Sequence, residues 1–227
     1  CIRDDHDHRT DGEVTAVTNR VPDPRRLAVL VDRCRLEVEN GTLPSAQVAV
    51  HVDGREYAFE TFGDATPSTR YVLQSTGRSI VAGVLWKLIS DGLLDTARPV
   101  AAYIPELATN GKDSVTVAQV VTHVGGFPLA PLGYPAMLHR EERLKAFAKW
   151  RLTYEPGTEL QFHLTSAAWV IAELCERLTG RPIGDYLRSL TEPLGLDSIE
   201  IGPPIERQQD VAKFVRTDAG TNDDVYA

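Results

Sequence analysis

The stretch YVLQSTGRSIVAGVLWKLISDG, residues 71–92, decides the fold of this chain. Apolar residues recur at three- and four-residue spacing after Ser75, which predicts a helix with one buried face. An Asp-Gly pair at positions 91–92 marks its end. The expected buried positions are Ile80, Val81, Val84, Leu85, Leu88 and Ile89. A serine before a helix is most often an N-cap, so Ser75 suggests a nucleophile only if its surroundings fit that chemistry.

The chain after this stretch is mainly helical in its pattern, because apolar residues keep the helical spacing and glycines end the segments. We expect helices over residues 115–124, 139–150, 165–179 and 182–190. Cys34 and Cys175 fall at core-like positions of predicted helices, and with Cys1 they make an odd number, so we expect no structural disulfide. No motif for nucleotide phosphates or zinc appears, so we expect no cofactor and no metal.

The chain before this stretch predicts one helix and one β-hairpin. Residues 22–41 carry apolar side chains at helical spacing and end at an Asn-Gly pair. Valines at 48, 50 and 52 then alternate with small or polar residues, and Asp53-Gly54 supplies a tight turn before the alternating residues 57–61. His51 lies on the face opposite the valines, which indicates a surface histidine.

Composition excludes several classes of function. The 227 residues carry 24 basic and 32 acidic side chains, and a net charge of −8 argues against binding nucleic acid. The longest apolar region, residues 80–94, contains Lys87 and Asp91, so no membrane span is expected. Residues 1–21 are expected to form a flexible polar tail. We expect its Asp4–His8 cluster to be a group of solvated charges and not a metal site. Residues 22–227 are then left for one domain.

Several sequence blocks, taken in order, carry a family resemblance. They are YVLQSTGRS (71–79), LWKLISDGLLD (85–95), PVAAYIPEL (99–107), VTVAQVVTHVGGFP (115–128), PGT (156–158), LTG (178–180) and PLGL (193–196). The chain resembles the serine β-lactamase and penicillin-binding-protein superfamily over about residues 24–202, in the class C-like branch that also holds esterases, D-aminopeptidases and acyltransferases. Any one block would be a weak signal, whereas the ordered set is strong.

The resemblance implies an α/β (α+β) fold, in which an antiparallel sheet is flanked by helices and an all-helical subdomain covers about residues 80–190. A cleft between these parts would hold Ser75. The implied activity is acyl transfer or hydrolysis on a small-molecule ester, amide or acyl substrate. His123, just before Gly125-Gly126, matches a common position of the family and reads as a structural residue at a helix end.

The family's serine motif is Ser-x-x-Lys, in which the lysine helps to deprotonate the serine. The matching residues here are Ser75 and Arg78. Arginine stays protonated at neutral pH, so Arg78 can supply positive charge but cannot act as a general base. Its role is either to stabilise a substrate anion or to shape the pocket through structural contacts.

The family's second motif, Tyr-x-Asn, matches Phe162, His163 and Leu164 here. Phenylalanine has no proton to exchange, and leucine has no amide to hold a substrate. In an extended segment Phe162 and Leu164 point to one side and His163 to the other, which predicts an apolar wall for the substrate pocket. His163 as a substitute base remains an alternative.

The family's third motif, Lys-Thr-Gly or His-x-Gly on a strand, has no match between residues 202 and 227. The resemblance therefore implies that the domain is incomplete at its C-terminal end, and that another segment or chain supplies the missing strands. Two functions stay open. One is a serine hydrolase or acyltransferase acting through Ser75. The other is a catalytically degenerate or repurposed member that binds a ligand or catalyses non-hydrolytic chemistry.

Overall fold

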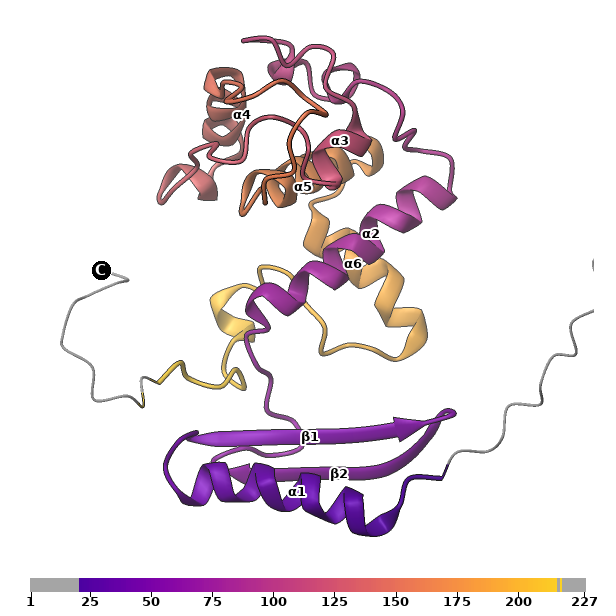
Figure 1. Cartoon of the computed structure of the whole chain (residues 1–227), viewed down its shortest axis with the longest axis vertical. Helices are drawn as coiled ribbons and strands as arrows, with labels where there is room; N and C mark the ends of the chain where they lie inside the picture. Colours follow the sequence, from indigo (N-terminus) through magenta and orange to yellow (C-terminus); the bar gives the residue numbers. More distant parts are fainter. Residues whose placement is uncertain (1–20, 216, 218–227) are drawn as a thin grey trace, which may run out of the picture. The chain divides into compact units, whose positions relative to one another are not determined.

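The computed structural model describes residues 21–215 and 217, and the chain divides into two compact units. Among the described residues, the first unit combines 21–71 with 210–215 and 217, and the second spans 72–209 (Figure 1). The predicted polar tail, with its Asp4–His8 cluster, lies outside the described residues except for Val21. The helical region expected at about residues 80–190 falls within the second unit.

The first unit contains the helix and the hairpin that the sequence predicts. Helix α1 (Pro24–Glu39) begins after Asp23, whose carboxylate accepts a hydrogen bond of 2.8 Å from the N–H of Arg25. Strands β1 (Ser45–Val52) and β2 (Arg55–Gly63) pair antiparallel, and α1 lies along them (Figure 1). Both predictions are confirmed.

A two-residue turn joins the strands. Asp53 (φ 51°) and Gly54 (φ 75°) are both left-handed, which is the backbone combination of a type I′ turn and suits the twist of a hairpin. His51 is exposed, as predicted, and lies 3.4 Å from the carboxylate of Glu56. Within residues 21–215 the sheet consists of these two strands, so each strand leaves one edge of backbone groups unpaired.

The second unit is helical. Its α-helices, within the described residues, are α2 (Arg78–Ser90), α3 (Val117–Val121), α4 (Arg140–Lys149), α5 (Ser166–Thr179) and α6 (Ile183–Thr191). Short 3₁₀ turns connect them: η1 (Gln74–Gly77), η2 (Val100–Ala102), η3 (Pro105–Leu107), η4 (Ala136–Leu138), η5 (Glu192–Leu194) and η6 (Ile205–Arg207). The predicted helices are confirmed, with ends shifted by a few residues.

The hydrophobic core of this unit gathers around α2, α5 and α6, which pack against one another (Figure 1). Val84, Leu85 and Leu88 of α2 are buried in it, as predicted. Ile89 is 39% exposed, so its predicted burial is wrong. The reason is angular, because Ile89 lies about 100° around the helix from the fully buried Leu88.

Candidate active site

Ser75 lies in the 3₁₀ turn η1, immediately before α2. The preceding residue, Gln74, has a left-handed backbone (φ 49°), and the turn closes through the N–H of Thr76, which donates to the Leu73 carbonyl over 3.1 Å. The N-cap of α2 is Gly77, with no side-chain cap, so Ser75 does not cap the helix. Its side chain is exposed, and its hydroxyl has no hydrogen bond to any described residue. Ser75 is therefore accessible to solvent, and its hydroxyl is not engaged by the described residues.

Arg78 is the first residue of α2, one turn after Ser75. Its guanidinium carbon lies 5.0 Å from the centre of the Phe162 ring, within the range of a cation–π contact. One guanidinium nitrogen also donates to the Leu164 carbonyl over 3.4 Å. Among residues 21–215 no carboxylate pairs with Arg78. The structure thus brings the two matches to the family motifs, at 78 and at 162–164, into contact.

The segment 162–164 alternates as the sequence predicts. Phe162 and Leu164 are 53% and 59% exposed, whereas His163 is 1% exposed. His163 Nε2 accepts a hydrogen bond from the N–H of Phe127 at 3.3 Å, and its Nδ1 donates to the Gln161 carbonyl at 2.7 Å. Because both ring nitrogens are engaged inside the core, His163 lies beneath the exposed wall instead of on it. This placement gives no support to His163 as a substitute base.

His123 is the residue whose place in the site the sequence did not indicate. Its ring centre lies 4.8 Å from that of Phe162, and its Nδ1 accepts a hydrogen bond of 3.2 Å from the N–H of His163. It follows α3 with a left-handed backbone (φ 65°), which turns the chain back toward the site. In the neutral ring the proton must then sit on Nε2. His123 therefore presents an N–H donor next to the Phe162 ring.

A glycine fixes the loop that carries His123. Gly126 has φ 88°, and a Cβ there would come within 2.7 Å of the Tyr154 carbonyl oxygen. Thr153 N–H donates to the Gly126 carbonyl at 2.7 Å, and Gly157 N–H donates to the Val124 carbonyl at 2.8 Å. These bonds hold the loop after α3 against residues 153–157. Only glycine fits this close backbone approach without strain.

The pKa of His123 and the pKa of His163 are both lower than the ordinary value for histidine. Burial lowers the pKa of His163 from 6.5, although its hydrogen bond to Gln161 opposes the shift. Burial also lowers the pKa of His123 from 6.5, and the positive charge of Arg78 lowers it further. Both rings are therefore neutral at pH 7, which agrees with the single proton that each hydrogen-bond pattern implies.

We expect the free energy of unfolding to decrease as the pH falls below about 6.5, because the unfolded histidines then take up protons that the folded ones resist. Urea denaturation at pH 7.5 and pH 5.5 measures this difference in the wild type, in His163→Gln and in His51→Gln. The His163→Gln variant should show a smaller difference, whereas the exposed His51 serves as the control. A His163→Gln difference equal to that of the wild type would contradict the assignment.

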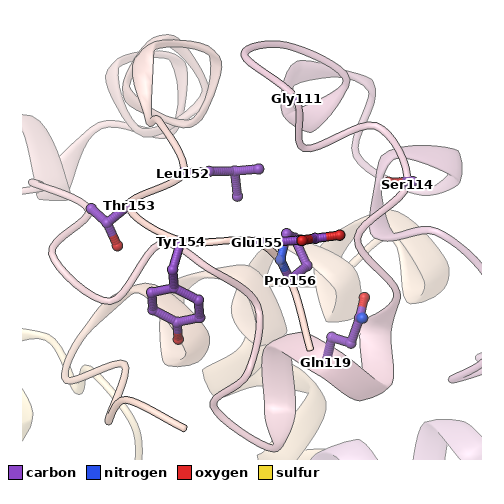
Figure 2. Close-up of a pocket in the computed structure, with 8 residues that line it drawn as sticks. All are labelled: Gly111, Ser114, Gln119, Leu152, Thr153, Tyr154, Glu155 and Pro156. Carbon is purple, nitrogen blue, oxygen red and sulfur yellow. The ribbon is translucent and has the colours of Figure 1, made fainter. Parts of the chain in front are cut away.

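A cavity of about 520 Å³ lies between residues 111–119 and residues 152–156. Figure 2 shows the Leu152 side chain directed into this space, with the Glu155 and Gln119 side chains below it. The lining residues are Gly111, Ser114, Gln119, Leu152, Thr153, Tyr154, Glu155 and Pro156. Ser75, Arg78 and residues 162–164 are not among the residues that line this cavity. Its link to the site is the Tyr154 hydroxyl, which donates to the His123 carbonyl at 3.4 Å.

In residues 21–215 and 217, no group of three histidine, cysteine or acidic side chains is arranged to hold a metal ion. In the same residues, no helix combines the length and the apolar character needed to cross a bilayer.

The family described as Beta-lactamase matches residues 32–226. The chain is 31% identical over 147 residues to the esterase/beta-lactamase LipL of Mycobacterium tuberculosis, an alignment that covers 62% of this chain and 33% of that protein. This chain spans about a third of the length of the curated relatives that it matches.

Two solved structures resemble the chain. A penicillin-binding-protein homologue from Caulobacter crescentus superposes with a TM-score of 0.74 at 27% identity, and covers 87% of this chain and 56% of its own. A family VIII carboxylesterase also gives a TM-score of 0.74, at 24% identity over 86% of this chain and 57% of its own. The second likeness shows the fold alone.

Proposed function

The chain belongs to the beta-lactamase family and has its α/β serine β-lactamase-like fold, and from that premise we propose that it is a serine hydrolase or acyltransferase acting on an ester or amide through an acyl-Ser75 intermediate. The observation that carries the proposal is the Ser75 hydroxyl. It is exposed, it is held on a fixed turn one helical turn before Arg78, and it has no hydrogen-bond partner among the described residues.

The proposed reaction has two displacement steps. The Ser75 oxygen forms a bond to the substrate carbonyl carbon, and its proton passes to a water molecule. The Arg78 guanidinium stabilises the oxyanion of the tetrahedral intermediate. Collapse of that intermediate releases the alcohol or amine, which takes up a proton from solvent. A second water then hydrolyses the acyl-Ser75 ester, or an alcohol or amine accepts the acyl group.

The proton-transfer step separates this chain from the family pattern. Arg78 cannot accept the serine proton, because its guanidinium stays charged at neutral pH. Phe162 has no ionisable group, and the lone pair on Nδ1 of His123 already accepts the N–H of His163. Water is then the proton acceptor, which is slower than a positioned side chain by about 100-fold or more. We therefore propose that this chain hydrolyses its substrate slowly.

A second candidate is a repurposed protein that keeps the site but does not transfer acyl groups. The observation that favours it is the contact between Arg78 and Phe162, because it joins two of the three positions that depart from the family motifs. In this case the exposed apolar side chains and the cation act in binding. Reactivity of Ser75 distinguishes the two candidates.

The sheet of the first unit bears on the whole protein. Both of its strands have one edge of unpaired backbone groups within residues 21–215. We propose that further strands, from another segment or another chain, pair with these edges. Unpaired edges of this kind readily accept an additional strand. This property supports the proposal that residues outside the described ones complete the sheet.

Hydrolysis of short-chain nitrophenyl esters tests the first candidate. We expect Ser75→Ala to lose about 100-fold in kcat/KM, because the nucleophile is removed. The matched control is Ser79→Ala, since Ser79 is also exposed and its hydroxyl donates only to the Thr76 carbonyl at 2.8 Å. It should stay within about threefold of wild type. Equal rates for wild type and Ser75→Ala would refute the nucleophile assignment.

A further inference from the structure

Arg78 differs from two other arginines of the helical unit in its partners. Arg140 and Arg177 both donate to the carboxylate of Glu173, at 2.6 Å in each case. Arg78 has no such partner among the described residues, and its contacts are the Phe162 ring and one long bond to a carbonyl. A half-buried guanidinium without an anion retains most of its capacity to form paired hydrogen bonds with a carboxylate.

The surface around this cation is apolar. Phe162 and Leu164, the two residues that Arg78 contacts, are 53% and 59% exposed, although both have large hydrophobic side chains. Removing such apolar groups from water lowers the free energy, so burial of their area favours a ligand that covers them. A fitting ligand therefore carries a hydrocarbon group beside its negative charge.

His123 supplies a second donor beside the same ring. Its Nδ1 is occupied by the N–H of His163, so its proton sits on Nε2, and Nε2 has no acceptor among the described residues. Its ring packs 4.8 Å from the Phe162 ring, at an angle of 59°. Arg78 and His123 thus both contact one exposed aromatic side chain, and both offer hydrogen-bond donors. A carboxylate, which only accepts, complements this pair.

We propose that Arg78, Phe162 and His123 form a binding site for an organic carboxylate that carries an apolar group. The guanidinium and the His123 N–H bind the two carboxylate oxygens, and the hydrocarbon covers Phe162 and Leu164. The site does not depend on acylation of Ser75. It would bind the acid released by a hydrolase, and it would equally serve a protein that binds such acids without chemistry.

The test is calorimetric titration of the Ser75→Ala variant with sodium octanoate and with octanamide, its uncharged counterpart. We expect octanoate to bind about tenfold more tightly, because a charge-assisted hydrogen bond distinguishes the two. Inorganic phosphate provides a third titration. Use of Ser75→Ala separates this test from the proposed function, because binding in a variant without the nucleophile says nothing about turnover.

Variants of Arg78 show whether this residue causes the preference for octanoate over octanamide. Arg78→Met in the same background should remove the preference for octanoate, and Arg78→Lys should keep it in part. The matched control is Arg98→Met, because the Arg98 guanidinium lies 5.0 Å from the ring of a different aromatic residue, Tyr103, in the same unit. Equal affinity for octanoate and octanamide would overturn the proposal. So would equal loss in Arg98→Met, or phosphate binding as tight as octanoate. The ligand comparison needs no variant of Arg78, so misfolding of Arg78→Met would leave the test intact.

Discussion

Replacing Arg78 by lysine and Phe162 by tyrosine together is expected to raise kcat/KM for nitrophenyl esters by about 100-fold. A lysine amine and a tyrosine phenol can exchange protons, whereas the guanidinium and the benzene ring that they replace cannot. The two side chains are already in contact, with the guanidinium 5.0 Å from the ring centre. The new amine and phenol should therefore lie close enough to relay the serine proton.

Controls for this gain are built into the same site. Each single substitution should give less than about tenfold, because the relay needs both groups. Adding Ser75→Ala to the double variant should abolish the gain, which ties it to the nucleophile. Initial rates with two nitrophenyl esters are measured for the wild type and for all four variants, after circular dichroism has shown that they fold. A folded double variant no faster than wild type would mean that other positions also block acylation.

Replacing Glu173 by glutamine is expected to lower the free energy of unfolding by about 3 kcal/mol. The Glu173 side chain is 1% exposed, and it accepts hydrogen bonds of 2.6 Å from both Arg140 and Arg177. Arg177 also forms an ion pair with Glu106 at 2.7 Å. The Glu173 carboxylate therefore connects α5 to α4 and, through Arg177, to η3. Without its charge, two cations lose their buried partner. The expected loss lies at the lower end of the range because both arginines keep some access to water.

Urea denaturation measures this effect, with Glu142→Gln as the matched control. Glu142 is an exposed residue of α4, paired with the exposed Lys145 at 2.6 Å. Its substitution should change the free energy of unfolding by less than about 0.5 kcal/mol. The result also bears on the site, because α5 begins two residues after Leu164. A Glu173→Gln loss no greater than that of Glu142→Gln would contradict the role given to the buried carboxylate.

The elements of both units could be predicted from the sequence, because helical and alternating spacing is a local property of the chain. The hairpin turn at Asp53-Gly54 is the clearest example, since its residues alone select a left-handed backbone. The predicted burial of Ile89 was wrong because burial is not a local property of the chain. Whether the flank of a helix is covered depends on the position of its neighbours, and no local pattern contains that information.

The candidate site was predictable in part. The alternation of Phe162, His163 and Leu164 follows from an extended backbone, and the structure places their side chains accordingly. Two features were out of reach. The helix cap falls on Gly77 rather than Ser75 because a 3₁₀ turn precedes α2. The contact of His123 with Phe162 joins residues that lie far apart in the chain, and only the folded loop brings them together.

A fluorophosphonate probe identifies the nucleophilic residue, because it forms a covalent adduct with an activated serine. Intact-mass spectrometry of the labelled wild-type protein, followed by peptide mapping, reports both the number of adducts and their position. We expect one adduct, on Ser75, and none on Ser79. A folded protein that takes no adduct, or that takes it on a different residue, would show that Ser75 is not the nucleophile.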